Sequence, residues 1–383
     1  MTAKKTVTGI TWNHSRGITP LLAAAQRFQE LHPDIEISWK KRTLQEFADY
    51  PIERLTEQYD LLIIDHPWVG CADATRCVLQ LDEYLPAAYL EDQQANSVGG
   101  SHLSYQYGGH QWALAIDAAT PVASYRADLL EKNREHCPST WEELLAMAKK
   151  GKVAVPAIPI DLLMSFYSFC LAHGKEPFLT REEVIDRETG LSALDSMKTL
   201  YSLVDRKMFA CNPIAVAELM SSTENYWYCP FAYGYSNYAR DGYSKHLLSY
   251  SDVIRFSDGR LLRTTVGGTG LSVSAGSAVK EEALAFAQFV VSGSCQTTLY
   301  VQNGGQPGYL GAWINETANG LTHNYFRDTL PALQRGYIRP RYNGYLYFQD
   351  HAGLPLHRWL KEGGDPLEVL EAMNRLYAES LAD

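Results

Sequence analysis

The order of apolar segments near the N-terminus constrains the fold more than any other feature of the sequence. Alternating apolar residues predict strands at Thr6–Trp12 and Ile35–Trp39, and the run DLLIID at Asp60–Asp65 predicts a strand that is apolar on both faces. Apolar residues at helical spacing from Leu21 to Leu31 separate the first two strands. This strand–helix–strand–helix–strand order predicts right-handed βαβ units in an open α/β sheet.

Several helices carry end signals in the sequence. Thr19 is predicted to cap the first helix, with Pro20 at its first helical position. Thr140 and Glu143 form a T-x-x-E capping box at the start of another helix. Asp365, which precedes a proline, marks the start of the last helix. Helices are therefore expected along the whole chain.

Length and charge exclude several classes of protein. The 383 residues suit two domains or lobes, and a net charge of −10 without a dense basic patch argues against a nucleic-acid partner. No apolar run reaches the ~18 residues that cross a bilayer. The N-terminal segment MTAKKTVTGITW lacks the apolar core of a signal peptide, so the protein is either cytosolic or has lost its leader.

The cysteines and the short motifs give no sign of catalysis, and we expect no enzyme, no cofactor and no metal. Seven cysteines at irregular spacing, without C-x-x-C, favour buried free thiols over a zinc site or a disulfide framework. No nucleophile elbow, metalloprotease motif, P-loop or dinucleotide fingerprint is present. Asp65, His66 and Cys71 have poor spacing for a metal site. A glycosidase would need two paired carboxylates, and no particular two are paired by the sequence.

Three segments together resemble a known family. YRADL at Tyr125–Leu129 is followed by PSTWEEL at Pro138–Leu144, and a Gly-Gly loop, strand and helix begin at Gly267. This order resembles the carbohydrate type of ABC-transporter solute-binding protein, extracellular solute-binding protein family 1. The matches are spread over most of the chain, which makes them more specific together than any one motif.

The resemblance implies a fold, a function and partners. The fold would be the type II periplasmic-binding-protein fold, in which two α/β lobes, each a mixed sheet flanked by helices, close about a hinge. The N-terminal lobe is expected at 1–114 and 265–311, and the C-terminal lobe at 115–264 and 312–383. We expect a periplasmic or extracellular monomer that captures a small carbohydrate or polyol and delivers it to the permease subunits of an ABC importer.

Candidate ligand residues follow the first and third predicted strands, because ligands of open α/β sheets lie at the carboxyl ends of the strands. Asp65, His66 and Trp68 form the strongest group, in which the carboxylate would accept hydroxyl protons and the indole would stack on a sugar face. The alternative is that Asp65 caps a short helix and His66 is buried in the core. A second group lies where the first predicted strand ends and comprises Trp12, His14 and Arg16.

Other candidates have competing roles. Arg16 is expected either to hold an acidic ligand or to form a salt bridge within one lobe, and Asp117 lies at the chain crossover, where hinge and ligand roles compete. Gly267 and Gly268 would allow close approach of the backbone to a ligand. The family resemblance adds Tyr233 and Tyr235, and Tyr342 is expected from the C-terminal lobe. Alternative ligands are a sugar acid, a polyamine, or a ferric ion held by Tyr233 and Tyr235.

Overall fold

The computed structural model describes residues 4–43, 46 and 50–382. The chain divides into two compact units. Unit 1 contains the chain up to Ala119, Val266–Arg327 and Arg341–Asn343. Unit 2 contains Thr120–Thr265, Asp328–Pro340 and the chain from Gly344 onward. The polypeptide thus passes between the units several times, as expected of two lobes that are not joined by a single linker.

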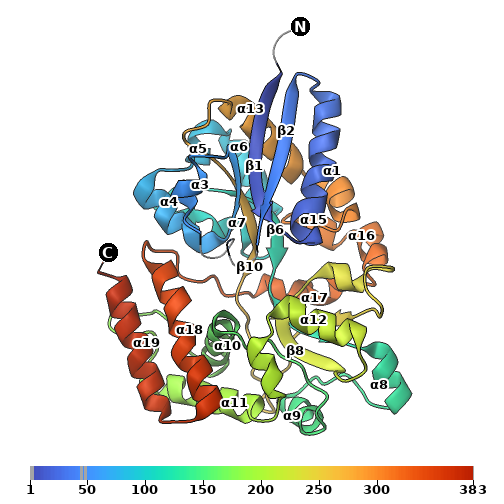
Figure 1. Ribbon diagram of the computed structural model, residues 1–383, viewed down its shortest axis with the longest axis vertical. Coiled ribbons are helices and arrows are strands. Elements are labelled where there is room, and N and C mark those ends of the chain that lie inside the picture. Colours follow the sequence, from blue (N-terminus) through green and yellow to red (C-terminus); the bar gives the residue numbers. More distant parts are fainter. Residues whose placement is uncertain (1–3, 44–45, 47–49, 383) are drawn as a thin grey trace. The chain divides into compact units, whose positions relative to one another are not determined.

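The sheet of unit 1 confirms the predicted open α/β arrangement. Its strands run in the order β2-β1-β3-β10-β6. β1 pairs in parallel with both β2 and β3, whereas β10 is antiparallel to β3 and β6 (Figure 1). The strand bounds are β1 (Lys5–Trp12), β2 (Ile35–Arg42), β3 (Leu61–Ile64), β6 (Leu114–Ala119) and β10 (Gly267–Val273). All four residues of β3 are buried, because neighbouring strands flank it and both of its faces are covered.

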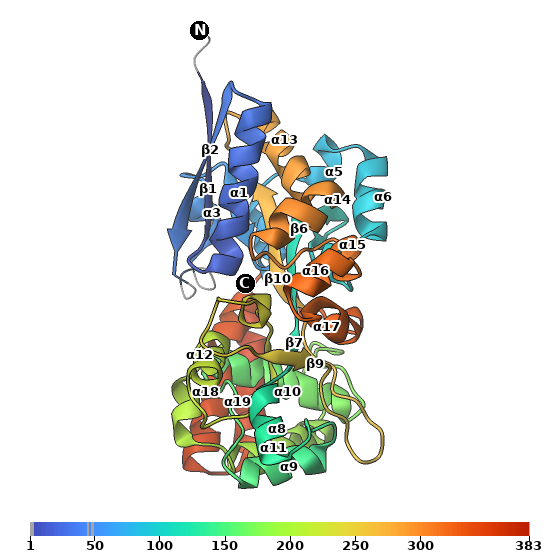
Figure 2. The same cartoon turned by 90° about the vertical axis from the view of Figure 1, so that its right-hand side faces the viewer.

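Two amphipathic helices of unit 1 pack together against the sheet. They are α1 (Ser15–Leu31) and α13 (Lys280–Val291), which lie side by side in Figure 2. The Phe28 ring meets Phe286 edge-on at 5.4 Å between centroids. The predicted start of α1 is wrong: the helix begins at Ser15, and Pro20 lies inside it rather than at its first position. The His14 imidazole caps this earlier start by accepting a hydrogen bond from the Arg16 backbone N–H.

The rest of unit 1 is short helices and one hairpin. The hairpin pairs β4 (Gln106–Tyr107) with β5 (His110–Gln111). The remaining helical segments are α3 (Ile52–Leu55), η1 (His66–Trp68), α4 (Val69–Thr75), α5 (Leu81–Tyr84), α6 (Ala87–Ala95), α7 (Ser101–Ser104), α14 (Gly293–Cys295), the π-helical η4 (Gln296–Tyr300), α15 (Leu310–Trp313) and α16 (Glu316–Leu321).

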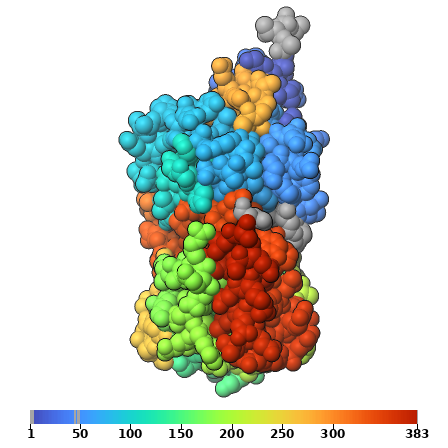
Figure 3. Space-filling view, turned by 90° about the vertical axis from the view of Figure 1, so that its left-hand side faces the viewer, coloured from blue at the N-terminus to red at the C-terminus, as the bar shows by residue number. Residues whose placement is uncertain are grey.

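Unit 2 combines a small sheet with long helices. β7 (Pro121–Tyr125) lies between β8 (Tyr228–Tyr233) and β9 (Ser249–Ser251), antiparallel to both, and a parallel bridge from Val153 to Tyr228 extends the β8 edge. Its helices are α8 (Ala127–Asn133), α9 (Trp141–Lys149), α10 (Pro159–Ala172), α11 (Arg187–Tyr201), η2 (Arg206–Ala210), α12 (Pro213–Ser222), η3 (Ser236–Ala239), α18 (Tyr345–Glu362) and α19 (Pro366–Ser380). In Figure 3 the α18–α19 pair (red) covers part of this unit's surface beside a green segment.

The predicted caps of two helices in unit 2 are confirmed. The Thr140 hydroxyl accepts from the Glu143 backbone N–H at 3.3 Å, and the Glu143 carboxylate accepts from the Thr140 backbone N–H at 3.1 Å. Asp365 caps α19 by accepting from the Leu367 backbone N–H at 2.9 Å. Local sequence therefore fixes these two helix starts.

The compact units end at residues that differ from the expected lobe boundaries. β6 lies wholly in unit 1 because it pairs with β10, so the first crossing follows Ala119 rather than residue 114. α15 and α16 also remain in unit 1, where the Trp313 indole N–H donates to the Pro307 carbonyl at 2.7 Å. α17 (Tyr325–Gln334) contains the passage from unit 1 to unit 2. All seven cysteines are free thiols.

Candidate functional site

The residues that follow β1 form one packed cluster in unit 1. The Trp12 and His14 rings stack with 5.4 Å between centroids, and the Arg16 guanidinium lies 5.6 Å from the Trp12 ring. A side chain at Gly17 would collide with the Trp12 indole at 2.5 Å. Burial, with a smaller contribution from Arg16, lowers the pKa of His14 to about 4. His14 is therefore neutral at pH 7, with its lone pair at Nδ1 directed to the Arg16 backbone N–H.

Arg16 and Asp117 are brought together in this cluster. Arg16 Nε donates to Asp117 Oδ2 at 2.9 Å, and Nη2 donates to Oδ1. Both side chains are almost fully buried. Burial raises the pKa of Asp117, while the charge and hydrogen bonds of Arg16 oppose that rise. The salt bridge within one lobe, one of the two roles expected of Arg16, is thus present.

The residues that follow β3 form a second group in unit 1. Asp65 caps η1, since its Oδ1 accepts from the His66 backbone N–H at 2.8 Å. His66 is buried, and its Nδ1 lies 3.3 Å from the same carboxylate oxygen. Trp68 is buried, and its indole N–H has no hydrogen-bond partner among the described residues. The capping role of Asp65 is therefore present, and Trp68 carries an unsatisfied donor.

At two glycines the backbone lies close to another segment that contains candidate residues. A Cβ at Gly70 would lie 1.9 Å from the Arg341 carbonyl oxygen, so the segment containing Tyr342 packs against the start of α4 in unit 1 rather than in the expected C-terminal lobe. Gly268 has φ of +98°, and a Cβ there would lie 2.2 Å from the Asp117 carbonyl oxygen. The close backbone approach at Gly268 is to β6, at the strand pairing that also includes Gly267 and Ala119.

In unit 2 the predicted tyrosines lie beside the chain crossings. The Tyr233 hydroxyl is 2.7 Å from the Thr265 hydroxyl. Thr265 also accepts through its carbonyl from the Thr120 hydroxyl at 2.9 Å, and Thr120 and Thr264 join their hydroxyls at 2.8 Å. Tyr235 is buried, and its carbonyl accepts from Tyr250. Hydroxyl groups therefore link the segment where the chain enters unit 2, at Thr120, to the segment where it leaves, at Thr265.

Asp161 is a candidate that the sequence analysis missed. It lies in the first turn of α10 beside a cavity of about 20 Å³, whose lining includes Ser165, Ser168 and Tyr233. Its Oδ2 is buried without a hydrogen-bond partner among the described residues, and burial raises its pKa to about 8. The signal in the sequence was the single acid in the apolar segment PIDLLMSFYSFCLA. A buried carboxyl without a partner is costly unless something else binds it.

The family of the chain follows from comparison with known proteins. Residues 12–292 match the family model described as bacterial extracellular solute-binding protein. The chain belongs to this family. The sequence-based assignment is thereby confirmed, and members of the family bind solutes without chemical conversion. No curated protein matches the sequence significantly.

Solved structures of solute-binding proteins share the fold. A maltose-bound MalE3 from T. maritima has a TM-score of 0.85 at 18% identity over 97% of this chain and 98% of its own. A solute-binding protein from Agrobacterium radiobacter K84 in complex with ribitol has a TM-score of 0.79 at 18% identity, with coverage of 98% and 99%. A maltotriose-bound protein from Thermus thermophilus has 0.80 at 18%, with coverage of 99% and 100%. The predicted periplasmic-binding-protein fold is confirmed.

Across 4–43, 46 and 50–382, no group of three or more His, Cys, Asp or Glu side chains is placed to hold a metal ion. No helix in the same ranges has both the length and the apolar character to cross a membrane.

Proposed function

We propose that this solute-binding protein captures a small carbohydrate or polyol between its two lobes outside the cytoplasmic membrane and delivers it to the permease of an ABC importer. The ligand contacts both lobes only when they close about the hinge. The difference in affinity between closed and open forms then shifts the population toward the closed form.

The observation that carries the carbohydrate assignment is the Asp161 carboxyl. Its Oδ2 is buried and unpartnered, and the neighbouring polar groups in the cavity are the hydroxyls of Ser165, Ser168 and Tyr233. The two serine hydroxyls donate to carbonyls of α10, and Ser165 also lies 3.3 Å from the Tyr201 hydroxyl, so Ser168 has the freer lone pairs to accept a hydrogen bond. Because a pKa of about 8 keeps this carboxyl protonated at pH 7, a ligand hydroxyl would accept from it and also donate to a neighbouring oxygen, as neutral polyhydroxylated molecules do.

Unit 1 offers a complementary group in Trp68. Its buried indole N–H lacks a partner among the described residues, so it suits a ligand oxygen, and the indole ring suits the apolar face of a sugar. Proteins of the same fold give independent support, because their structures hold maltose, ribitol and maltotriose. We assign Asp65, His66 and Tyr342 to the same region of unit 1 as positioning or contact residues.

A polyamine is the second candidate ligand, because an ammonium group also pairs with a buried, unpartnered carboxylate. The observations give less support to a sugar acid, since the Arg16 guanidinium is already bound by Asp117 through two hydrogen bonds. They also give less support to ferric tyrosinate, since the Tyr233 phenol is within hydrogen-bond distance of the Thr265 hydroxyl.

A thermal-shift screen of refolded, ligand-stripped protein tests the proposal. The panel contains sugars, polyols, sugar acids, polyamines, amino acids and ferric ion. A ligand at 100 times its dissociation constant stabilises the protein by about 2.7 kcal/mol, which is several degrees for a chain of this size. We expect hits among sugars or polyols whose stabilising effect is smaller in Asp161→Leu. Hits confined to polyamines or iron would overturn the carbohydrate assignment while leaving the family intact.

A further inference from the structure

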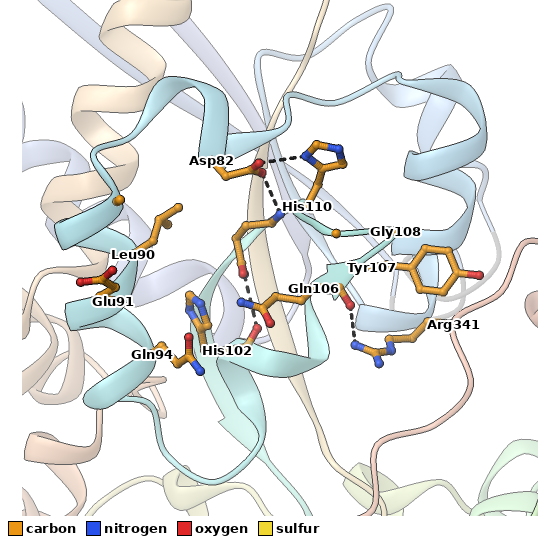
Figure 4. Close-up of a pocket in the computed structure, with 13 residues that line it drawn as sticks. Asp82, Leu90, Glu91, Gln94, His102, Gln106, Tyr107, Gly108, His110 and Arg341 are labelled. Atoms are coloured by element: carbon orange, nitrogen blue, oxygen red, sulfur yellow. Dashed lines mark hydrogen bonds and ion pairs between the residues drawn. The ribbon is translucent and has the colours of Figure 1, made fainter.

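Besides the cavity next to Asp161 in unit 2, the structure has a cavity of about 580 Å³ in unit 1. Its lining shares no residue with the groups that follow β1 and β3. Its walls are α5, α6, α7, the β4–β5 hairpin and Arg341, and Figure 4 shows polar side chains from all of these segments gathered around it. The volume lies within the range of roughly 300–1,000 Å³ that is typical of small-molecule sites in proteins.

The walls of this cavity are held by hydrogen bonds within unit 1. Asp82 Oδ2 lies 2.8 Å from His110 Nδ1, and Asp82 Oδ1 accepts from the Gln111 backbone N–H at 2.9 Å (Figure 4). Arg341 Nη1 donates to the carbonyls of Leu103 at 2.7 Å and Gln106 at 2.6 Å. These bonds join α5 to the hairpin and Arg341 to α7, so the hollow is formed before any ligand binds.

Two of the residues that line the cavity have buried polar side chains. His102 and Gln111 are only 2% and 3% exposed. The Gln111 amide donates to the His102 carbonyl at 3.3 Å and the Ala113 carbonyl at 2.7 Å, while its Oε1 has no partner among the described residues. Burial lowers the pKa of His102 to about 4, so its imidazole is neutral at pH 7 and presents one donor and one acceptor.

The charges around the cavity disfavour an anion. The lining contains two carboxylates, Asp82 and Glu91, and one guanidinium, that of Arg341. The Nη1 atom of Arg341 donates to backbone carbonyls. The unpartnered Gln111 Oε1 requires a donor, and the amides and neutral imidazole offer both donors and acceptors. We propose that this cavity is a second binding site, for a neutral, hydroxyl-rich molecule about the size of a monosaccharide. This inference does not depend on the ligand of the first site.

Histidine NMR tests the proposal, because the histidines of the two sites differ. His102 and His110 line the cavity, whereas His14 and His66 belong to the groups that follow β1 and β3. The full chain is labelled with ¹³C at histidine Cε1 and titrated at pH 7 with D-glucose, D-gluconate and D-glucosamine, which match in size and differ in charge. Ala87→Trp fills the cavity, and Ala88→Trp is its matched control, because both alanines are exposed and only Ala87 lines the cavity.

We expect D-glucose to shift the His102 signal in the wild type and in Ala88→Trp, and to leave it unchanged in Ala87→Trp. A response to gluconate or glucosamine without one to glucose would overturn the neutral ligand class. A glucose response that survives in Ala87→Trp, or no response of His102 to any probe, would overturn the site itself. Failure of the first-site proposal is judged separately, by the thermal-shift screen with Asp161→Leu, because the cavity beside Asp161 and the cavity in unit 1 share no lining residue.

Discussion

Arg16 and Asp117 stand 101 positions apart in the sequence and form a buried ion pair with two hydrogen bonds in unit 1. The pair joins the start of α1 to β6, next to the residue at which the chain first leaves this unit. Arg16 was a candidate for ligand contact because it follows the first strand, and Asp117 because it lies at the chain crossover, and the structure gives each of them a partner within the protein. Their first effect is therefore on the stability of unit 1.

We predict that Arg16→Met lowers the free energy of unfolding by about 3–5 kcal/mol, because it leaves the Asp117 carboxylate buried without its partner. Urea unfolding followed by circular dichroism measures the change. Arg27→Met is the control on the same helix, since Arg27 and Glu30 form an exposed pair whose contribution to stability is small. Equal losses in the two variants would contradict a structural role for the buried pair.

We predict that Asp161 makes the protein less stable as pH rises. Burial raises the folded pKa to about 8 from 3.8, so the native state binds more protons than the unfolded state between those values. Stability then falls with rising pH in this window, by up to about 1.4 kcal/mol per pH unit from this group, and levels off above pH 8. Melting temperatures of the ligand-free wild type and Asp161→Asn should diverge between pH 4 and 8. Parallel profiles would show that Asp161 finds a compensating partner.

We predict that Asp65→Ala weakens ligand binding at least tenfold while costing about 1 kcal/mol of stability through the lost cap of η1. Calorimetric titration and urea unfolding measure the two effects. Asp365→Ala is the control, because it removes the cap of α19 by the same chemistry and should leave affinity unchanged. If Asp65→Ala binds as well as the wild type, Asp65 is a capping residue only.

We predict that Glu143 contributes stability that is lost in acid. The Ser139 backbone N–H is the main donor that lowers its pKa, to about 2 from 4.5. A depressed carboxyl pKa stabilises the fold above pH 4.5, and that contribution disappears as pH falls toward 2. Acid unfolding of Glu143→Gln should therefore depend less on pH in this range than that of the wild type. Glu142→Gln, one residue earlier in the same helical turn, should behave as the wild type does.

Local patterns predicted much of the fold. Alternation identified β1 and β2, continuous apolar character identified the buried β3, and the Thr140–Glu143 capping box is formed as predicted. Each of these elements depends on residues that are close together in the sequence, so a local sequence pattern is enough to predict it. The prediction that α1 begins at Thr19 and Pro20 was wrong. The helix begins earlier because the His14 imidazole caps it, and histidine is not among the residues that usually cap helices.

The arrangement of the candidate site depends on contacts between distant segments. The partner of Arg16 comes from β6, and the cavity beside Asp161 is lined by β8 residues such as Tyr233. Neither contact follows from periodicity or from motif spacing, so the sequence identified residue types near strand ends and missed Asp161. The cavity in unit 1 is equally a product of packing among α5, α6 and the β4–β5 hairpin.

Isothermal titration calorimetry of the strongest ligand from the screen tests the central claim most directly. The claim is that one ligand is bound by residues from both units, so Trp68→Leu in unit 1 and Asp161→Leu in unit 2 are compared with Trp39→Leu and Asp186→Leu, which change buried or capping residues elsewhere. We predict a roughly five- to 150-fold loss of affinity at the site shared by the two units in each of the first two variants, with little change in the controls. A loss confined to one unit, or equal losses in the controls, would contradict the account.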